Sequence, residues 1–158
     1  MTGPPIAPGA PAAVPRPPSL DAAVAYLALG EGALAVIELL ALTSKGDTTG
    51  GFDAAQRHYW LGLAHLLAYD WSAATHELRT YVGGGEGGWR AGWAFLHLGR
   101  AYEQAGRTDE ASLAYRGCLS VAGAERSARK LAFDLMSRLA NSMPIGYGQA
   151  PTRPASSA

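Results

Sequence analysis

Residues 95–115 read FLHLGRAYEQAGRTDEASLAY, and the order of small and aromatic residues in this stretch decides the fold. Gly99 and Ala111 have almost no side chain, so two antiparallel helices can approach each other closely at these positions. Tyr102 and Tyr115 are placed to fill the space beside that contact. The stretch therefore predicts a pair of antiparallel helices joined by a short turn.

Two further copies of this spacing lie upstream. In one copy Ala74 follows His65 by nine residues, and in the other Ala35 follows Tyr26 by nine, the interval found in residues 95–115. The small residues at the helix contacts of successive copies are 39 and 37 residues apart. The extra length lies in glycine-rich linkers, where insertion costs little free energy. The chain is therefore predicted to contain three helix pairs.

The pattern resembles the tetratricopeptide repeat, a family built from stacked helix pairs of about 34 residues. The residues that carry the resemblance are Phe95, Leu98, Gly99, Tyr102, Gly106, Ala111 and Tyr115. The upstream copies depart from it, with His65 where the family prefers Tyr, Tyr69 where it prefers Gly, and Ala23 where it prefers Gly. The resemblance covers about residues 19–123. It implies three helix hairpins in a right-handed superhelical stack.

Apolar residues recur at helical spacing between the two ends of the chain, which predicts an all-α protein without a sheet. The predicted helices span residues 19–29, 32–43, 53–68, 70–82, 89–104, 108–121 and 125–141. Asp53, Asp70 and Thr108 are expected to cap three of them. The last helix is expected to close the stack as a cap. Its predicted inner stripe consists of Ala128, Leu131, Ala132, Leu135 and Leu139, and its predicted outer face of Arg126, Arg129, Lys130 and Arg138.

Both ends of the chain differ from this middle part in composition. Residues 1–18 contain seven prolines and a single charged residue, and residues 143–158 combine prolines with small polar residues. Such segments lack the apolar content to fold alone, so they are expected to be extended or disordered. The predicted organisation is a proline-rich arm (1–18), one domain (19–142) and an extended tail (143–158).

Composition limits the classes of partner. The 13 basic and 13 acidic residues cancel, so no overall attraction to nucleic acid is expected. The most apolar stretch, residues 22–42, is broken by Gly30, Glu31 and Gly32, so no transmembrane span is predicted. No secretory signal is visible, and the single cysteine, Cys118, favours a reducing compartment. The expected location is the cytoplasm, with peripheral attachment to a membrane complex left open.

In the family that the chain resembles, the first helix of each pair lines a concave groove that binds proteins. Carried over to this sequence, the register predicts a mainly apolar groove without the Lys, Asn and Arg set that binds a C-terminal carboxylate in some relatives. The predicted partner-binding residues are Leu20, Val24, Leu27, Tyr59, Leu63, Leu66, Trp89, Trp93, Leu96 and Arg100. Leu63 and Leu96 fit equally well into the core between repeats. The chain's own proline-rich arm is an alternative occupant of the groove.

No pattern in the sequence predicts catalysis or a bound metal or cofactor. His58 and His65 share a helix face but lack the four-residue spacing of a metal site, and the glycine-rich loop 83–88 lacks the Lys-Ser or Lys-Thr of a phosphate-binding loop. Cys118 is expected to be a buried, inert thiol. Trp60 and Trp71 are expected in the core.

The expected function is that of a non-enzymatic scaffold or assembly subunit of a multiprotein complex, which binds an apolar or helical segment in its groove and lays its tails along its neighbours. Two alternatives are kept. One is a small chaperone for a hydrophobic client, and the other, from a different class, is an enzyme or metal-site protein.

Overall fold

The computed structural model describes residues 17–44, 53–85 and 87–142, and these form seven α-helices and no strand. The helices are α1 (Leu20–Ala28), α2 (Gly32–Ser44), α3 (Ala54–Leu67), α4 (Trp71–Gly83), α5 (Gly88–Gln104), α6 (Thr108–Ser120) and α7 (Arg126–Ser142). The all-α prediction is confirmed, and each predicted boundary lies within one residue of the observed one. The tail at 143–158 and most of the arm at 1–18 lie outside the described residues.

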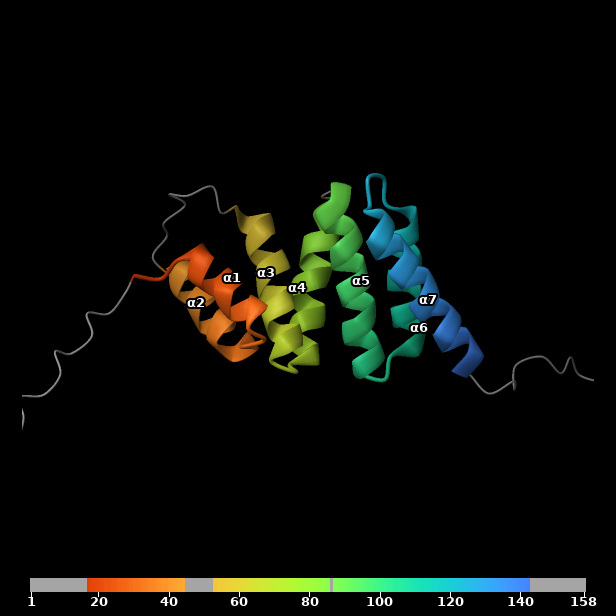
Figure 1. Cartoon of the computed structure of the whole chain (residues 1–158), viewed down its shortest axis with the longest axis horizontal. Helices are drawn as coiled ribbons and strands as arrows, with labels where there is room; N and C mark the ends of the chain where they lie inside the picture. Colours follow the sequence, from red (N-terminus) through yellow and green to blue (C-terminus); the bar gives the residue numbers. More distant parts are fainter. Residues whose placement is uncertain (1–16, 45–52, 86, 143–158) are drawn as a thin grey trace, which may run out of the picture.

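The helices form two layers, and each helix packs against the next one along the chain (Figure 1). In addition, α1 contacts α3, α3 contacts α5, and α5 contacts α7. Among the described residues, no two even-numbered helices come into contact. The odd-numbered helices are therefore the more closely spaced layer.

The chain reverses direction within each of the three helix pairs by the same turn. Its central residue is Gly30, Tyr69 or Gly106, with left-handed φ angles of 78°, 61° and 75°. The amide of the following residue donates to the carbonyl five residues earlier, at 2.9, 3.0 and 2.8 Å. These bonds satisfy carbonyls at the end of the helix. Tyr69 thus adopts a backbone conformation that glycine provides in the other two turns.

Small residues lie where the paired helices touch, as predicted. A Cβ atom added to Gly62 would lie 2.5 Å from the Leu78 Cγ, and one added to Gly99 would lie 2.4 Å from the Tyr115 Cε1. The equivalent residues of the three pairs are all fully buried: Ala35, Ala74 and Ala111, followed four residues later by Leu39, Leu78 and Tyr115. The repeated spacing in the sequence therefore corresponds to a repeated packing contact.

Three of the helix starts show how local sequence sets the boundaries. The side chains of Asp53 and Asp70 accept hydrogen bonds from backbone amides three residues later, at 2.6 and 3.0 Å, which confirms both predicted caps. The predicted cap at Thr108 is wrong, because Thr108 is the first residue of α6. Arg107 occupies the cap position, without a capping hydrogen bond. Arg107 instead pairs with Glu110 at 2.7 Å in the first turn.

The last helix closes the stack mainly as predicted. Its buried stripe contains Ala128, Ala132 and Leu139, with Leu135 partly buried. Leu131 does not belong to this stripe and is 40% exposed. The reason is rotational, because residues advance by about 100° each around a helix and Leu131 lies about 60° to one side of Ala128. The predicted outer residues Arg126, Arg129, Lys130 and Arg138 are all exposed.

Candidate partner-binding groove

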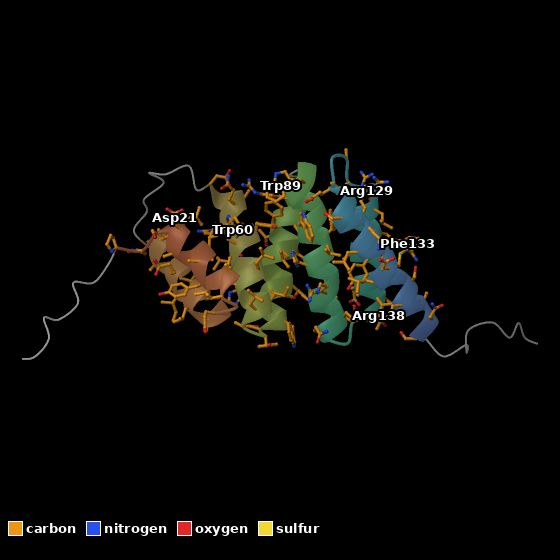
Figure 2. The ribbon with its side chains drawn as sticks, viewed as in Figure 1. Asp21, Trp60, Trp89, Arg129, Phe133 and Arg138 are labelled. Carbon is orange, nitrogen blue, oxygen red and sulfur yellow. The ribbon has the colours of Figure 1, made fainter. Side chains whose placement is uncertain are left out.

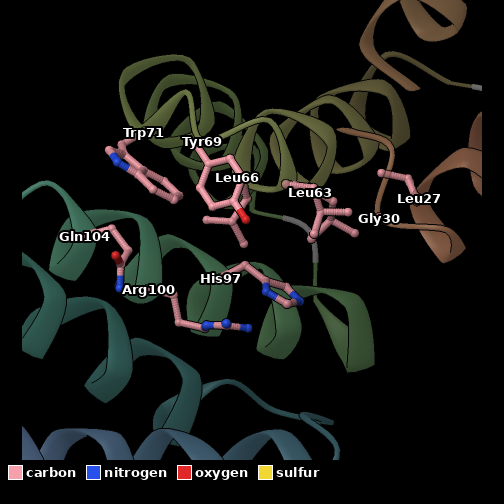
Figure 3. Close-up of a pocket in the computed structure, with 10 residues that line it drawn as sticks. Leu27, Gly30, Leu63, Leu66, Tyr69, Trp71, His97, Arg100 and Gln104 are labelled. Carbon is pink, nitrogen blue, oxygen red and sulfur yellow. The ribbon is translucent and has the colours of Figure 1, made fainter. Parts of the chain in front are cut away.

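A groove of about 610 Å³ opens over the layer of odd-numbered helices. It lies between the turn after α1, the second half of α3 and the second half of α5, and the first residue of α4 closes one end (Figure 3). Its lining residues are Leu27, Gly30, Leu63, Leu66, Leu67, Tyr69, Trp71, His97, Arg100 and Gln104. We call this feature the groove.

One side of the groove is an apolar wall formed by α3 and the start of α4. Leu66 and Leu67 project from the last turn of α3, and neither belongs to a buried core cluster. Tyr69 is 77% exposed and packs edge to face against Trp71, with ring centroids 5.5 Å apart. Leu63 has a double role, because it lines the groove and also packs against the main core. The wall therefore presents large apolar side chains that the fold leaves partly uncovered.

Tyr69 combines exposure with an unfavourable backbone conformation. A left-handed φ costs a residue with a Cβ atom about 1–2 kcal/mol, and the equivalent turns use glycine. Neither burial nor a cap explains an aromatic residue here, because most of its side chain faces solvent. Strained residues of this kind are concentrated at binding and catalytic sites. Trp71, which the sequence placed in the core, lies beside Tyr69 in the groove.

The opposite side of the groove is a polar strip on α5. It consists of His97, Arg100 and Gln104, which lie three and four residues apart and so share one helix face. Arg100 is exposed and carries the only formal charge among the lining residues when His97 is neutral. Burial, and secondly the neighbouring Arg100 charge, lowers the pKa of His97 from 6.5 to about 4. His97 is therefore neutral near pH 7.

Two polar groups of this strip lack partners within the described part of the chain. The Nδ1 atom of His97 is buried and makes no hydrogen bond there. Arg100 is not in any ion pair found among the described residues. The neighbouring carboxylate of Glu103 accepts a hydrogen bond from the Tyr115 hydroxyl at 2.8 Å and is ion-paired with Arg138. The charge of Glu103 is thus already shared with two other groups.

Four of the ten predicted partner-binding residues line the groove: Leu27, Leu63, Leu66 and Arg100. Tyr59 is 5% exposed, so its prediction is wrong, and Leu96 is fully buried in the main core, which is the alternative left open for it. On α5 Arg100 was predicted correctly, but its neighbour one turn earlier was not. The groove face carries His97 where Leu96 was predicted, and one residue is about 100° of rotation around the helix.

The other four predicted residues lie outside the groove. Leu20 is partly buried against the smaller core cluster, and Val24 is 37% exposed. Trp93 is partly buried, and its Nε1 donates to Glu125 at 2.8 Å. Trp89 is 51% exposed at the beginning of α5, toward the upper end of the stack in Figure 2. Trp89 therefore does not contribute to this site.

Six lining residues were not among the predicted partner-binding residues: Gly30, Leu67, Tyr69, Trp71, His97 and Gln104. One signal was present for Tyr69, because the other two copies have glycine at the equivalent position. The others could not be found by spacing, since Leu67 and Gln104 lie at helix ends where the register depends on how neighbouring pairs tilt.

Outside the groove, the remaining reactive side chains have structural surroundings. Cys118 is fully buried, and burial raises the pKa of its thiol, as expected for an inert residue. The Nδ1 atom of His58 lies 2.6 Å from a carboxylate oxygen of Glu77. Across the described ranges, no three His, Cys, Asp or Glu residues gather closely enough to hold a metal ion. None of the seven described helices has the length and apolar character needed to cross a membrane.

The chain was compared with models of protein families, with curated proteins and with solved structures. No family model, no curated protein and no solved structure matches it.

Proposed function

We propose that this chain is a non-enzymatic interaction scaffold of the tetratricopeptide-repeat type, an assembly subunit that binds an apolar helical segment of another protein in the groove. The observation that carries the proposal is Tyr69, an exposed aromatic residue held in a conformation that favours glycine, at the rim of an apolar wall. A residue that weakens the fold, and whose side chain is mostly exposed apart from its contact with Trp71, is best explained by a contact outside the fold.

The arrangement of helices supports the repeat assignment. The three pairs share one turn geometry and one buried contact between small and large residues. The odd-numbered helices, which are the first of each pair, form the more closely spaced layer. In a superhelix of such pairs this layer lines the inner surface, and the groove lies there.

The energetics favour an apolar ligand. Burial of apolar surface contributes about 25 cal/mol per Å², so full burial of one Leu or Phe side chain contributes about 1.5–3 kcal/mol. Several such side chains are needed to offset the cost of ordering both partners. A helical segment suits this task, because it presents apolar residues at i, i+3 and i+4 along one face.

The proposal can be tested with a library of random 16-residue peptides displayed on phage and selected on the immobilised full chain. Enriched peptides would then be synthesised, and their dissociation constants measured by fluorescence anisotropy. Leu66→Glu should abolish binding by placing a charge in the apolar wall, while leaving the circular dichroism spectrum unchanged. Leu113→Glu is the matched control, because Leu113 is 63% exposed on α6, away from the groove.

Tyr69→Gly provides a second arm that cannot be confused with unfolding. The change relieves a left-handed tyrosine, so the melting temperature should stay the same or rise, while peptide affinity should fall about tenfold with the loss of one aromatic contact. Failure to enrich any peptide would refute the proposal. Enriched peptides that bind Leu66→Glu as tightly as the unaltered chain would refute it too.

A further inference from the structure

The two sides of the groove differ in chemistry along its whole length. The wall formed by α3 and α4 is apolar, whereas the strip on α5 consists of His97, Arg100 and Gln104 (Figure 3). Among the described lining residues there is no Asp or Glu, so none of them neutralises Arg100. The nearest candidate on the same helix, Glu103, is held by Tyr115 and Arg138. Within the described part of the chain, the groove therefore has a positive side without a counter-charge.

The shape of the strip indicates which kind of acidic ligand fits. From His97 to Gln104 is seven residues, which is about 10 Å along a helix. A terminal carboxylate is held by donors that converge on one point, and these three side chains are instead spread along the groove. Two turns of an amphipathic helix match this length, with the apolar face toward Leu66 and Tyr69 and the flank toward α5.

The two ends of this chain do not supply an acidic helical ligand for the groove. Residues 1–16 and 143–158 contain no Asp and no Glu. Either segment could bring apolar side chains to the groove, but neither could bring an acidic side chain to Arg100. Charge complementarity thus favours a separate protein over the chain's own ends.

We propose that the groove binds an amphipathic helical segment of a partner protein, and that an Asp or Glu side chain on the flank of this segment pairs with Arg100. The inference rests on the proposed function, because it names the chemistry of the ligand of that same groove. Arg100, which is exposed in the groove, sets the orientation of the segment.

The test uses the displayed library on three forms of the full chain: unaltered, Arg100→Gln and Arg79→Gln. Arg79 is the matched control, because it is exposed on α4 and does not line the groove. We expect peptides selected on the unaltered chain and on Arg79→Gln to carry Asp or Glu at a fixed spacing from their apolar residues. Selection on Arg100→Gln should enrich the same apolar residues without the acidic one.

Synthetic peptides with amidated C-termini then measure the contact directly. Replacing the enriched Glu by Gln should weaken binding to the unaltered chain about two- to fivefold at low salt, the range expected for a partly exposed ion pair. The same replacement should have no effect on Arg100→Gln. Increasing the salt concentration should reduce the difference, because ions screen exposed charges.

The outcomes separate this inference from the proposed function. Apolar peptides that are enriched without an acidic position, or a Glu-to-Gln effect that persists in Arg100→Gln, would overturn the inference and leave the groove as a binding site. Peptides that bind only with a free C-terminal carboxylate, or that tolerate a central proline, would overturn the helical ligand. Absence of any enriched peptide would overturn both proposals.

Discussion

The contact between Gly99 and Tyr115 provides a sharp test of the packing, through the substitution Gly99→Ala. A Cβ atom at position 99 would lie 2.4 Å from the Tyr115 Cε1, and ordinary contact begins at 3.4 Å, so the ring would have to move by about 1 Å. The ring is fully buried, and its hydroxyl is bonded to Glu103. It therefore has little freedom to move.

The magnitude follows from two opposing effects. Overpacking a close-packed site costs about 1–3 kcal/mol, and the rigid ring places this case near the upper end. Alanine in a helix interior is favoured over glycine by about 1 kcal/mol. The net loss of stability is about 2 kcal/mol. In a domain of this size, that corresponds to a fall in melting temperature of about 8 °C.

Thermal unfolding followed by circular dichroism measures this shift. The control is Gly83→Ala in α4, where no atom lies within 4 Å of the added Cβ, so the melting temperature should stay unchanged or rise. In a Tyr115→Leu background the same Gly99→Ala change should cost little, because the ring is gone and the two changes are coupled. A higher melting temperature for Gly99→Ala alone, or equal cost in both backgrounds, would refute the proposed helix contact.

Two further predictions concern titratable groups. The folded state lowers the pKa of His97 from its ordinary value of 6.5 to about 4. Between these two pH values the unfolded chain binds one more proton than the folded chain. The free energy of unfolding should therefore fall as the pH drops from 6.5 to 4. The difference between the melting temperatures at pH 7.5 and pH 5 should be smaller for His97→Gln than for the unaltered chain. An imidazole resonance of His97 that titrates near 6.5 would contradict the lowered pKa. Cys118 is fully buried and the pKa of its thiol is raised, so an aromatic disulfide reagent at pH 7.5 should label it only after unfolding in guanidinium. Stoichiometric labelling of the native protein within seconds would show that the thiol is accessible.

The limits of sequence reasoning appear most clearly on α5. The spacing of Gly99, Tyr102 and Ala111 predicted the helix pair and its contact correctly, because these residues act through short-range packing with fixed intervals. The groove face of the same helix was predicted correctly at Arg100, but one turn earlier Leu96 was assigned to the groove and His97 was not. The two residues are adjacent on α5, and only the packing of α5 against its neighbouring helices determines which one is covered.

Tyr69 shows a second limit. Its place in the turn could be derived from the sequence, since the other copies have glycine there, but its exposure could not. The aromatic ring could have folded inward as a substitute for a core residue. Its direction depends on the left-handed φ and on the neighbouring Trp71, which together point the ring along the open side of the groove.

The sequence by itself determined the seven helices, their boundaries and the pairing of the first six, because helix periodicity, caps and small-residue contacts act between residues close in the chain. The tertiary structure alone decided where those pairs leave a groove, which side chains line it, and that Arg100 has no ion-pair partner there among the described residues. Those properties arise from the angles between successive pairs. Such angles are set by many weak side-chain contacts between distant residues, and no single spacing in the sequence records them.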